Sequence, residues 1–239
     1  MSGCTPVISW REWAPVYDRI VNEFGFDRCA DRRARDELAN LAADSPLQLA
    51  DLPELADRTV AIAGGAPTLA ADIERAATAD RVIAASDAAG VLLDAGVDVL
   101  AMVTDLDKRP AVAHDVIRAG GFVAVHAHGD NRPALAEWVP QLRLDRVLPT
   151  TQVRPRLPVV NTGGFTDGDR AAFLAAGCGA GELTFPGWDF DDANVPKRKH
   201  QKLRWAARLL YWLERRRGDR FSLLDDRRSS LDLTGFPPP

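Results

Sequence analysis

The sequence predicts an α/β fold: a mainly parallel, Rossmann-like sheet with flanking helices, an N-terminal helical segment and a long C-terminal helix. From Thr59 onward, short apolar runs alternate with helical stretches of about ten residues, which is typical of right-handed βαβ units. Several of these runs end in glycine, aspartate or histidine. Open α/β sheets bind ligands beyond the carboxyl ends of their strands, so a polar site is expected at that edge.

Three regions follow from this pattern. Residues 1–55 form the N-terminal helical segment, in which Ser9 and Glu12 have capping-box spacing and residues 32–43 predict a second helix. Residues 56–218 form the α/β domain, where the chemistry is expected, and include a last helix over 197–217. Residues 219–239 form a polar tail, and its final three prolines are expected to be frayed.

The expected strands and helices alternate through the α/β domain. The strands cover residues 59–63, 81–85, 97–103, 121–125, 146–148, 157–160 and 182–185. The helices run from Thr68 to about 77, from Asp87 over a short stretch, and over 111–119, 133–142 and 166–176.

Composition narrows the class of protein. The chain has 239 residues and 46% hydrophobic content, enough for one large domain with a real core. No apolar stretch approaches the roughly 18 residues of a membrane span, and no signal peptide is visible, so a cytoplasmic protein is expected. A net charge of −4 argues against nucleic acid as a partner. Three cysteines (4, 29 and 178) are odd in number and far apart, so neither a metal knuckle nor a disulfide framework is expected.

Asp105 and Asp107 stand directly after the apolar run 100–103. At i, i+2 spacing in extended chain, their carboxylates would share one side and could hold Mg²⁺ through oxygen ligands. The structural alternative is helix capping, because Pro110 opens a helix shortly afterwards. That alternative accounts for one aspartate more readily than for two.

The segment 125–131 is the densest polar cluster of the chain. It contains His126 and His128, two of only four histidines, with Asp130 and Asn131 beside them. Neutral imidazoles could bind a transition metal, whereas protonated ones could bind phosphate or act as acids.

Two glycine turns also fall between an expected strand and a helix. Gly64 and Gly65, ahead of Thr68, could present backbone amides to an anion or could form an ordinary turn. Gly163 and Gly164 precede Thr166, Asp167, Asp169 and Arg170. Thr166 and Asp169 have the spacing of a helix cap, while Asn161 and Asp167 have no evident structural need.

Taken together, four motifs resemble one family. They are Val-Thr-Asp-Leu-Asp at 103–107, Val-His-Ala-His-Gly-Asp-Asn at 125–131, Thr-Thr-Gln at 150–152 and Gly-Gly-Phe-Thr-Asp-Gly-Asp-Arg-Ala at 163–171. The chain is similar, from about residue 60 to about 209, to the archaeal 6-hydroxymethyl-7,8-dihydropterin pyrophosphokinases of the MptE type, whose fold is related to that of thiamine pyrophosphokinases. The resemblance implies Mg²⁺-dependent transfer of diphosphate from ATP to the pterin hydroxymethyl group, with release of AMP, in methanopterin or folate synthesis.

The site residues expected on this basis fall into four groups. The expected catalytic residues are His126, His128 and Asp130, and the sequence does not indicate which of the three is the general base. The expected Mg²⁺ ligands are Asp105 and Asp107. The nucleotide and its phosphates are expected to contact Gly64, Gly65, Thr68, Asp87, Thr166, Asp167, Asp169, Arg170, Lys199 and Lys202. The pterin is expected to contact Asn131, Gln152, Asn161, Trp188 and Asp189. ATP and a hydroxymethyl pterin are thus the expected partners. The sequence does not decide whether the protein forms a homo-oligomer.

Three positions depart from the family pattern. Lys108 replaces the usual glycine after Asp-Leu-Asp, Pro149 precedes Thr150 in place of glycine, and Trp188 begins a Trp-Asp-Phe-Asp version of the usual Met-Asp-Phe-Gly. The acidic and histidine motifs are intact.

Two other classes of protein share some of these motifs. A metal-dependent hydrolase could use His-x-His-x-Asp, but its ligand set needs a histidine where Asn131 stands, and only His114 and His200 remain as later ligands. A non-catalytic nucleotide-binding module would need the glycine turn but not the two aspartates.

Overall fold

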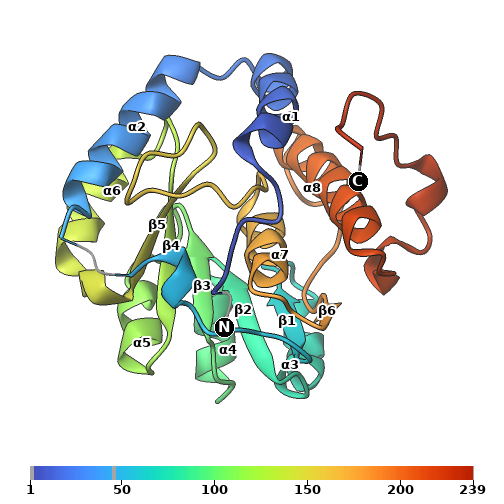
Figure 1. Cartoon of the computed structure of the whole chain (residues 1–239). Helices are drawn as coiled ribbons and strands as arrows, with labels where there is room; N and C mark the ends of the chain where they lie inside the picture. Colours follow the sequence, from blue (N-terminus) through green and yellow to red (C-terminus); the bar gives the residue numbers. More distant parts are fainter. Residues whose placement is uncertain (1–2, 45–46, 239) are drawn as a thin grey trace.

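The computed structural model describes residues 3–44 and 47–238. Its sheet has six parallel strands in the order β5-β4-β3-β2-β1-β6, which confirms the predicted fold class (Figure 1). The strands are β1 Thr59–Ala63, β2 Arg81–Ala85, β3 Ala101–Thr104, β4 Phe122–Ala127, β5 Val147–Thr151 and β6 Glu182–Thr184. The helices are α1 Trp10–Phe24, α2 Arg28–Leu41, α3 Leu69–Ala77, α4 Ala88–Asp94, α5 Val112–Arg118, α6 Arg132–Trp138, α7 Asp167–Gly177 and α8 Lys197–Arg217.

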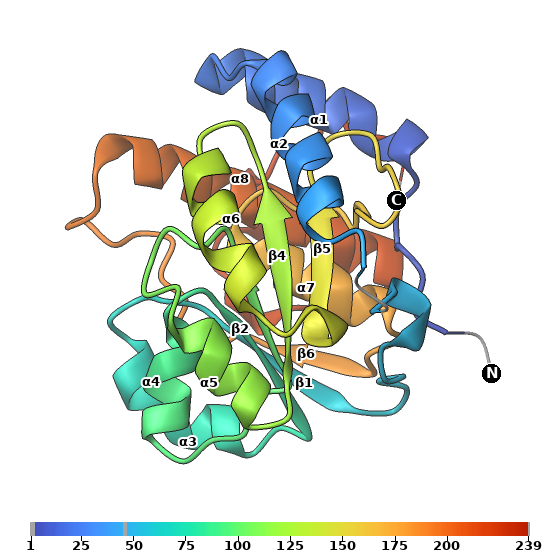
Figure 2. The same ribbon diagram turned by 90° about the vertical axis from the view of Figure 1, so that its left-hand side faces the viewer.

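Both faces of the sheet are covered by helices. Successive side chains of a strand point to opposite faces, so Val60 and Ile62 of β1 join a core beneath α1, α7 and α8. Ala61 and Ala63 join a second core beneath α2 to α6 on the other face (Figure 2). Strands buried on both faces explain the continuous apolar runs in the sequence. None of the described helices is long and apolar enough to cross a membrane.

Several predicted boundaries differ from the structure. The second helix begins at Arg28, four residues earlier than expected, because Asp27 caps it by accepting the Cys29 N–H. The third strand begins only at Ala101, after a turn at Gly96 (φ +77°). Residues 157–160 form isolated bridges rather than a strand, and Pro158 has no N–H to donate to a ladder.

The C-terminal tail is more ordered than its composition suggests. The Trp212 indole N–H donates to the Pro237 carbonyl at 3.1 Å, and the Phe236 ring lies against Trp205 and Trp212. Arg216 Nη1 also donates to the Pro238 carbonyl at 3.4 Å, so the expectation of frayed prolines is wrong for Pro237 and Pro238. Pro239 lies outside the described residues. So does Pro46, which the sequence places with Pro53 at the two ends of an expected loop.

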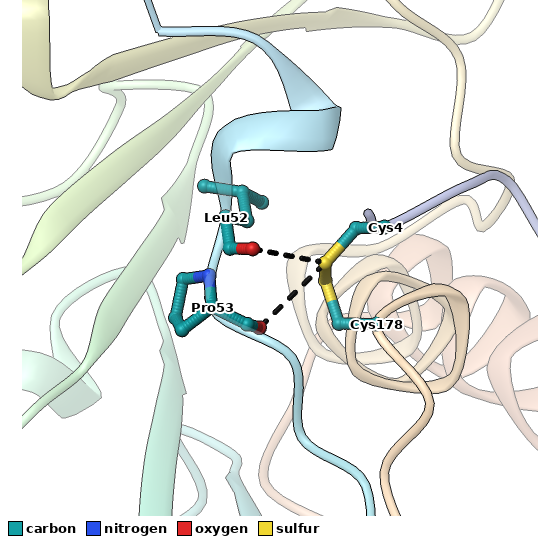
Figure 3. Close-up of a disulfide and its surroundings, with 4 residues drawn as sticks. All are labelled: Cys4, Leu52, Pro53 and Cys178. Atoms are coloured by element: carbon teal, nitrogen blue, oxygen red, sulfur yellow. Dashed lines mark hydrogen bonds between the residues drawn. A yellow bond between two sulfur atoms is a disulfide. The ribbon is translucent and has the colours of Figure 1, made fainter. Parts of the chain in front are cut away.

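The N-terminal segment is held to α7 by a disulfide between Cys4 and Cys178 (Figure 3). The Cys4 Sγ lies 3.6 Å from the carbonyl oxygens of Leu52 and Pro53, and the Thr5 N–H donates to the Gly177 carbonyl at 2.9 Å. The expectation of no disulfide framework is wrong for Cys4 and Cys178, because the fold brings together two residues that are 174 positions apart. Cys29 is the free, exposed cysteine.

Reduction of this disulfide is expected to destabilise the protein without unfolding it at moderate temperature. A crosslink over so long a segment is worth about 2–4 kcal/mol, or about 4–16 °C in Tm for a chain of this size. Thermal unfolding of the Cys29→Ser variant with and without reductant measures the effect, and Cys178→Ser should match the reduced form. An unchanged Tm in both comparisons would show that the disulfide contributes nothing to stability.

Candidate functional site

A cavity of about 580 Å³ opens at the carboxyl edge of the sheet, where the loops after β1, β2, β3 and β4 converge. The loop after β6, the α1–α2 connection and the first turns of α7 and α8 complete its walls. All strand pairings are parallel, so these loops leave the sheet at one edge. Most of the predicted site residues therefore gather around one cavity.

Asp105 and Asp107 follow β3 on a tight turn. Leu106 between them has a left-handed backbone (φ +64°), and its N–H donates to Thr104 Oγ1 at 2.9 Å. The assumption of extended chain is wrong here, because this turn interrupts it. The turn still joins the two residues, because the Asp107 N–H donates to Asp105 Oδ1 at 3.2 Å.

The pKa values of the two carboxyl groups are shifted in opposite directions. Burial raises the pKa of Asp107 to about 6, and the adjacent Asp105 carboxylate contributes to this increase. Asp105 is also buried, which opposes its ionisation, but hydrogen bonding with His128 and Asp107 holds its pKa well below the usual range.

This carboxyl pair fits a magnesium ion. A divalent cation would offset the repulsion between Asp105 and Asp107, and Mg²⁺ is usually bound by one or two carboxylates, with phosphate and water oxygens completing its shell. Within residues 3–44 and 47–238, no group of three or more His, Cys, Asp or Glu side chains could hold an ion. The ion would thus depend on its substrate for much of its coordination.

The two predicted histidines occupy different environments. His128 lines the cavity, and its Nε2 lies 3.2 Å from Asp105 Oδ2. His126 lies inside β4, which extends further than expected, and is 2% exposed with its Nδ1 3.0 Å from Thr150 Oγ1. Burial lowers the pKa of His126 well below its usual value, so its ring is neutral. His126 does not line the cavity and lies behind its wall. Asp130 lines the cavity at an exposed position.

Asn131 links the loops that carry these residues. Its Nδ2 donates to the carbonyls of Asp105 and His126 at 2.8 and 2.7 Å, and its Oδ1 accepts the His128 N–H at 3.0 Å. Although we expected it to contact substrate, Asn131 does not line the cavity. Its contacts fix the position of the acidic loop relative to the histidine loop.

Basic side chains face the acid pair from α7 and α8. Arg170 is 5% exposed, with its Nη1 3.1 Å from Asp167 Oδ1 and its Nη2 donating to Gln152 Oε1 at 3.2 Å. Lys199 and Lys202 line the same cavity, and burial lowers the pKa of Lys202. Burial, and then the nearby Asp105 carboxylate, raise the pKa of Asp167 to about 8. Cations beside a carboxyl pair that could hold a metal ion suit a polyphosphate chain.

The glycine turn after β1 offers fewer free amides than expected. The Gly64 N–H donates to the Pro186 carbonyl and the Ala66 N–H to the Gly187 carbonyl, at 2.9 and 3.0 Å. Those two bonds tie the turn to the loop after β6 and leave little of it to surround an anion. Gly64 and Gly65 nevertheless line the cavity.

Trp188, from the loop after β6, also lines this side. Its indole N–H donates to the Ile62 carbonyl at 2.8 Å. A Cβ on Gly64 or Gly168 would come within 2.9 or 2.6 Å of its ring. Glycine at both positions thus allows the indole to lie against the walls.

Of the predicted site residues, fifteen line the cavity and five do not. Those on the cavity are Gly64, Gly65, Asp87, Asp105, Asp107, His128, Asp130, Gln152, Thr166, Asp167, Arg170, Trp188, Asp189, Lys199 and Lys202. Those away from it are Thr68, His126, Asn131, Asn161 and Asp169.

Two of those five, Asn161 and Asp169, have structural contacts. Asn161 donates to the Val153 carbonyl and accepts the Gly163 N–H, both at 2.9 Å. Asp169 accepts the N–H groups of Phe165 and Thr166 as part of the predicted capping box.

A buried carboxylate that the sequence analysis missed connects the N-terminal segment to the site. Asp31 of α2 is 3% exposed; its Oδ1 accepts the Gly129 N–H at 2.7 Å, and its Oδ2 accepts the Tyr17 hydroxyl and Gln152 Nε2, both at 2.8 Å. Gln152 in turn accepts from Arg170, so the contacts continue to the cation. An acidic residue in register with Ala34 and Leu38 on the apolar face of a helix was the available signal.

Asp31→Asn is expected to lower turnover about 10- to 100-fold while the protein stays folded. An amide cannot accept all three hydrogen bonds, so Gln152 and with it Arg170 lose their fixed orientation; a hydrogen bond to a charged group is worth about 1.5–3 kcal/mol. Steady-state kinetics and thermal unfolding measure the two effects, with Asp44→Asn, an exposed residue, as the control. Wild-type turnover in Asp31→Asn would remove this residue from the site.

The fold and the site together define a Rossmann-like α/β protein with a metal-competent acid pair beside buried cations. The sequence pattern of a family described as 6-hydroxymethylpterin diphosphokinase MptE-like matches residues 36–195. Similar proteins include two named 6-hydroxymethyl-7,8-dihydropterin pyrophosphokinase. The one from Methanothermobacter thermautotrophicus is 37% identical over 86% of this chain and 94% of its own length. The one from Pyrococcus furiosus is 36% identical over 87% of this chain and 95% of its own. The chain belongs to the MptE-like diphosphokinase family.

Proposed function

We propose that this enzyme transfers the terminal diphosphate of ATP to the hydroxymethyl group of 6-hydroxymethyl-7,8-dihydropterin, in a Mg²⁺-dependent reaction that releases AMP. The observation that carries the proposal is the carboxyl pair Asp105–Asp107, which lines one cavity together with His128 and Arg170 and contacts His128 directly. Family membership supports transfer to a pterin as the reaction of this site. It also favours diphosphate transfer over the hydrolase and the binding module. The product would serve methanopterin or folate synthesis.

In this reaction the pterin hydroxyl oxygen forms a bond to the β-phosphorus as the bond from that phosphorus to the α,β-bridging oxygen breaks. AMP departs with the bridging oxygen, and the hydroxyl loses its proton. Mg²⁺ bound by Asp105 and Asp107 would supply charge neutralisation along the phosphates. The protein's part in such a transfer is mainly positioning and electrostatic stabilisation.

The residues of the cavity divide this work. Arg170, Lys199 and Lys202 line the cavity and would bind the phosphate oxygens. The Nε of Arg170 supports this role, because it has no hydrogen-bond partner among the described residues. His128 and Asp130 line the cavity and are the groups able to orient the hydroxyl or take its proton, whereas the neutral, buried His126 would support the wall behind them.

Dependence on the acceptor alcohol tests the proposal. With ATP and Mg²⁺, the enzyme should form a pterin diphosphate from the hydroxymethyl pterin and none from the 6-methyl analogue, which lacks the attacking oxygen. Mass spectrometry of the pterin product decides the outcome. No diphosphate product from the hydroxymethyl pterin at any Mg²⁺ concentration would reject the proposed acceptor.

A further inference from the structure

Two polar side chains at the end of β2 have no protein partner in the described part of the chain. Ser86 lies on the cavity wall, is 6% exposed, and has a buried Oγ without a hydrogen bond. The next residue, Asp87, is half-buried on the same wall, and its carboxylate makes neither a cap nor an ion pair. Buried polar groups nearly always have a partner, so the Ser86 hydroxyl, with the free Asp87 carboxylate beside it, points to a ligand with hydrogen-bond donors.

The backbone fixes this pair between the glycine turn and the acid pair. The Ser86 N–H donates to the Val103 carbonyl of β3 at 2.8 Å, so the turn is anchored two residues before Asp105. On the other side, a Cβ on Gly65 would lie 3.3 Å from Asp87 Oδ1. Asp87 therefore lies beside the glycine turn, on the same cavity wall.

The neighbouring wall suits a planar base. Trp188, Ala66 and Pro67 line the cavity next to Gly64 and Gly65, and the Trp188 indole is fixed by its bond to Ile62. An aromatic plane beside small apolar side chains can stack on a purine ring while the adjacent hydroxyl and carboxylate bind its sugar.

We propose that Ser86 and Asp87 bind the ribose of the nucleotide, with its base toward Trp188, so that the AMP half of ATP lies over the ends of β1 and β2. Trp188 then contacts the nucleotide rather than the pterin, to which the family resemblance assigned it. The consequence for the acceptor rests on the proposed diphosphate transfer. In-line displacement places the attacking alcohol opposite the departing AMP. Since β3 carries the acid pair between β2 and β4, the acceptor enters on the β4 side, beside His128 and Phe26.

Binding of α,β-methylene-ATP with Mg²⁺, measured by calorimetry without any pterin, tests the ribose site. This probe resists cleavage at the bond that the reaction breaks. Asp87→Ala is expected to bind it about 10- to 100-fold more weakly than the wild type does, the range for a charged hydrogen bond. Asp94→Ala, which removes an exposed carboxylate at the other end of α4, is the matched control and should bind as the wild type does.

A second measurement tests whether the sugar hydroxyls contribute to binding. The wild type should bind the 2′-deoxy or the 3′-deoxy form of the probe at least about tenfold more weakly, and Asp87→Ala should not distinguish that form from the parent. Discrimination that persists in Asp87→Ala would overturn the proposal, and so would unchanged binding of the parent probe. Weaker pterin binding with unaltered probe binding would overturn it too, by assigning Asp87 to the acceptor.

These measurements separate the ribose site from the reaction. If the wild type binds the probe with the expected sugar preference but forms no pterin diphosphate, the ribose site stands and the proposed acceptor fails. If the wild type does not bind the probe, the ribose site is rejected whatever the acceptor is.

Discussion

Asparagine in place of Asp105 or Asp107 is expected to abolish diphosphate transfer while the fold is retained. Each substitution keeps the size of the side chain but removes a negative charge from the pair that would bind Mg²⁺ beside the phosphates. A metal ion contributes several kcal/mol to transition-state stabilisation, so losing its site should lower kcat at least about a thousandfold. Turnover over a range of Mg²⁺ concentrations, together with thermal unfolding, measures the effect.

The control for this pair is Asp115→Asn. Asp115 is on α5, outside the cavity, and makes an exposed ion pair with Arg118. Its variant should have wild-type kinetics. Near-normal turnover in both Asp105→Asn and Asp107→Asn would remove the assignment of a metal site, whereas loss of activity together with loss of the folded state would assign the pair to stability.

Arg170→Met is expected to lower kcat about 100- to 1,000-fold, the usual effect of removing a preorganised donor from developing charge. The substitution also leaves Asp167 and the Gln152 Oε1 without their partner. Arg170→Lys retains the charge but cannot contact both at once, so its kcat should lie between those of Arg170→Met and the wild type.

Steady-state kinetics of the two Arg170 variants, with Arg75→Met as an exposed control, tests this ranking. Wild-type kcat in Arg170→Met would show that the phosphates are bound elsewhere in the cavity. Equal loss in the methionine and lysine variants would assign the effect to the geometry of the guanidinium rather than to its charge.

Periodicity made the sheet predictable. The strands at 59–63 and 81–85 and the helix at 197–217 have the predicted ends, because their apolar patterns stop at a cap or a turn residue. The predicted ends of β3 and β4 were wrong, because hydrogen bonds with neighbouring strands decide where each strand begins and ends. Composition alone does not encode that pairing.

The site was predictable where a residue ends a strand and less so where distant segments meet. Asp105 and His128 were identified from their place in the chain, and both line the cavity. Asp31 was missed because its partners, Tyr17, Gly129 and Gln152, come from segments up to 121 residues away in sequence. The disulfide between residues 4 and 178 was missed for the same reason.

The nucleotide released in a single turnover is the most direct test of diphosphate transfer by this site. Enzyme in excess over ATP, with Mg²⁺ and 6-hydroxymethyl-7,8-dihydropterin, is quenched, and its nucleotides are separated by chromatography. Attack at the β-phosphorus predicts AMP and a pterin diphosphate in equal amounts, with neither formed when the pterin or Mg²⁺ is omitted. ADP as the dominant product would mean attack at the γ-phosphorus and would contradict the mechanism even if the pterin became phosphorylated.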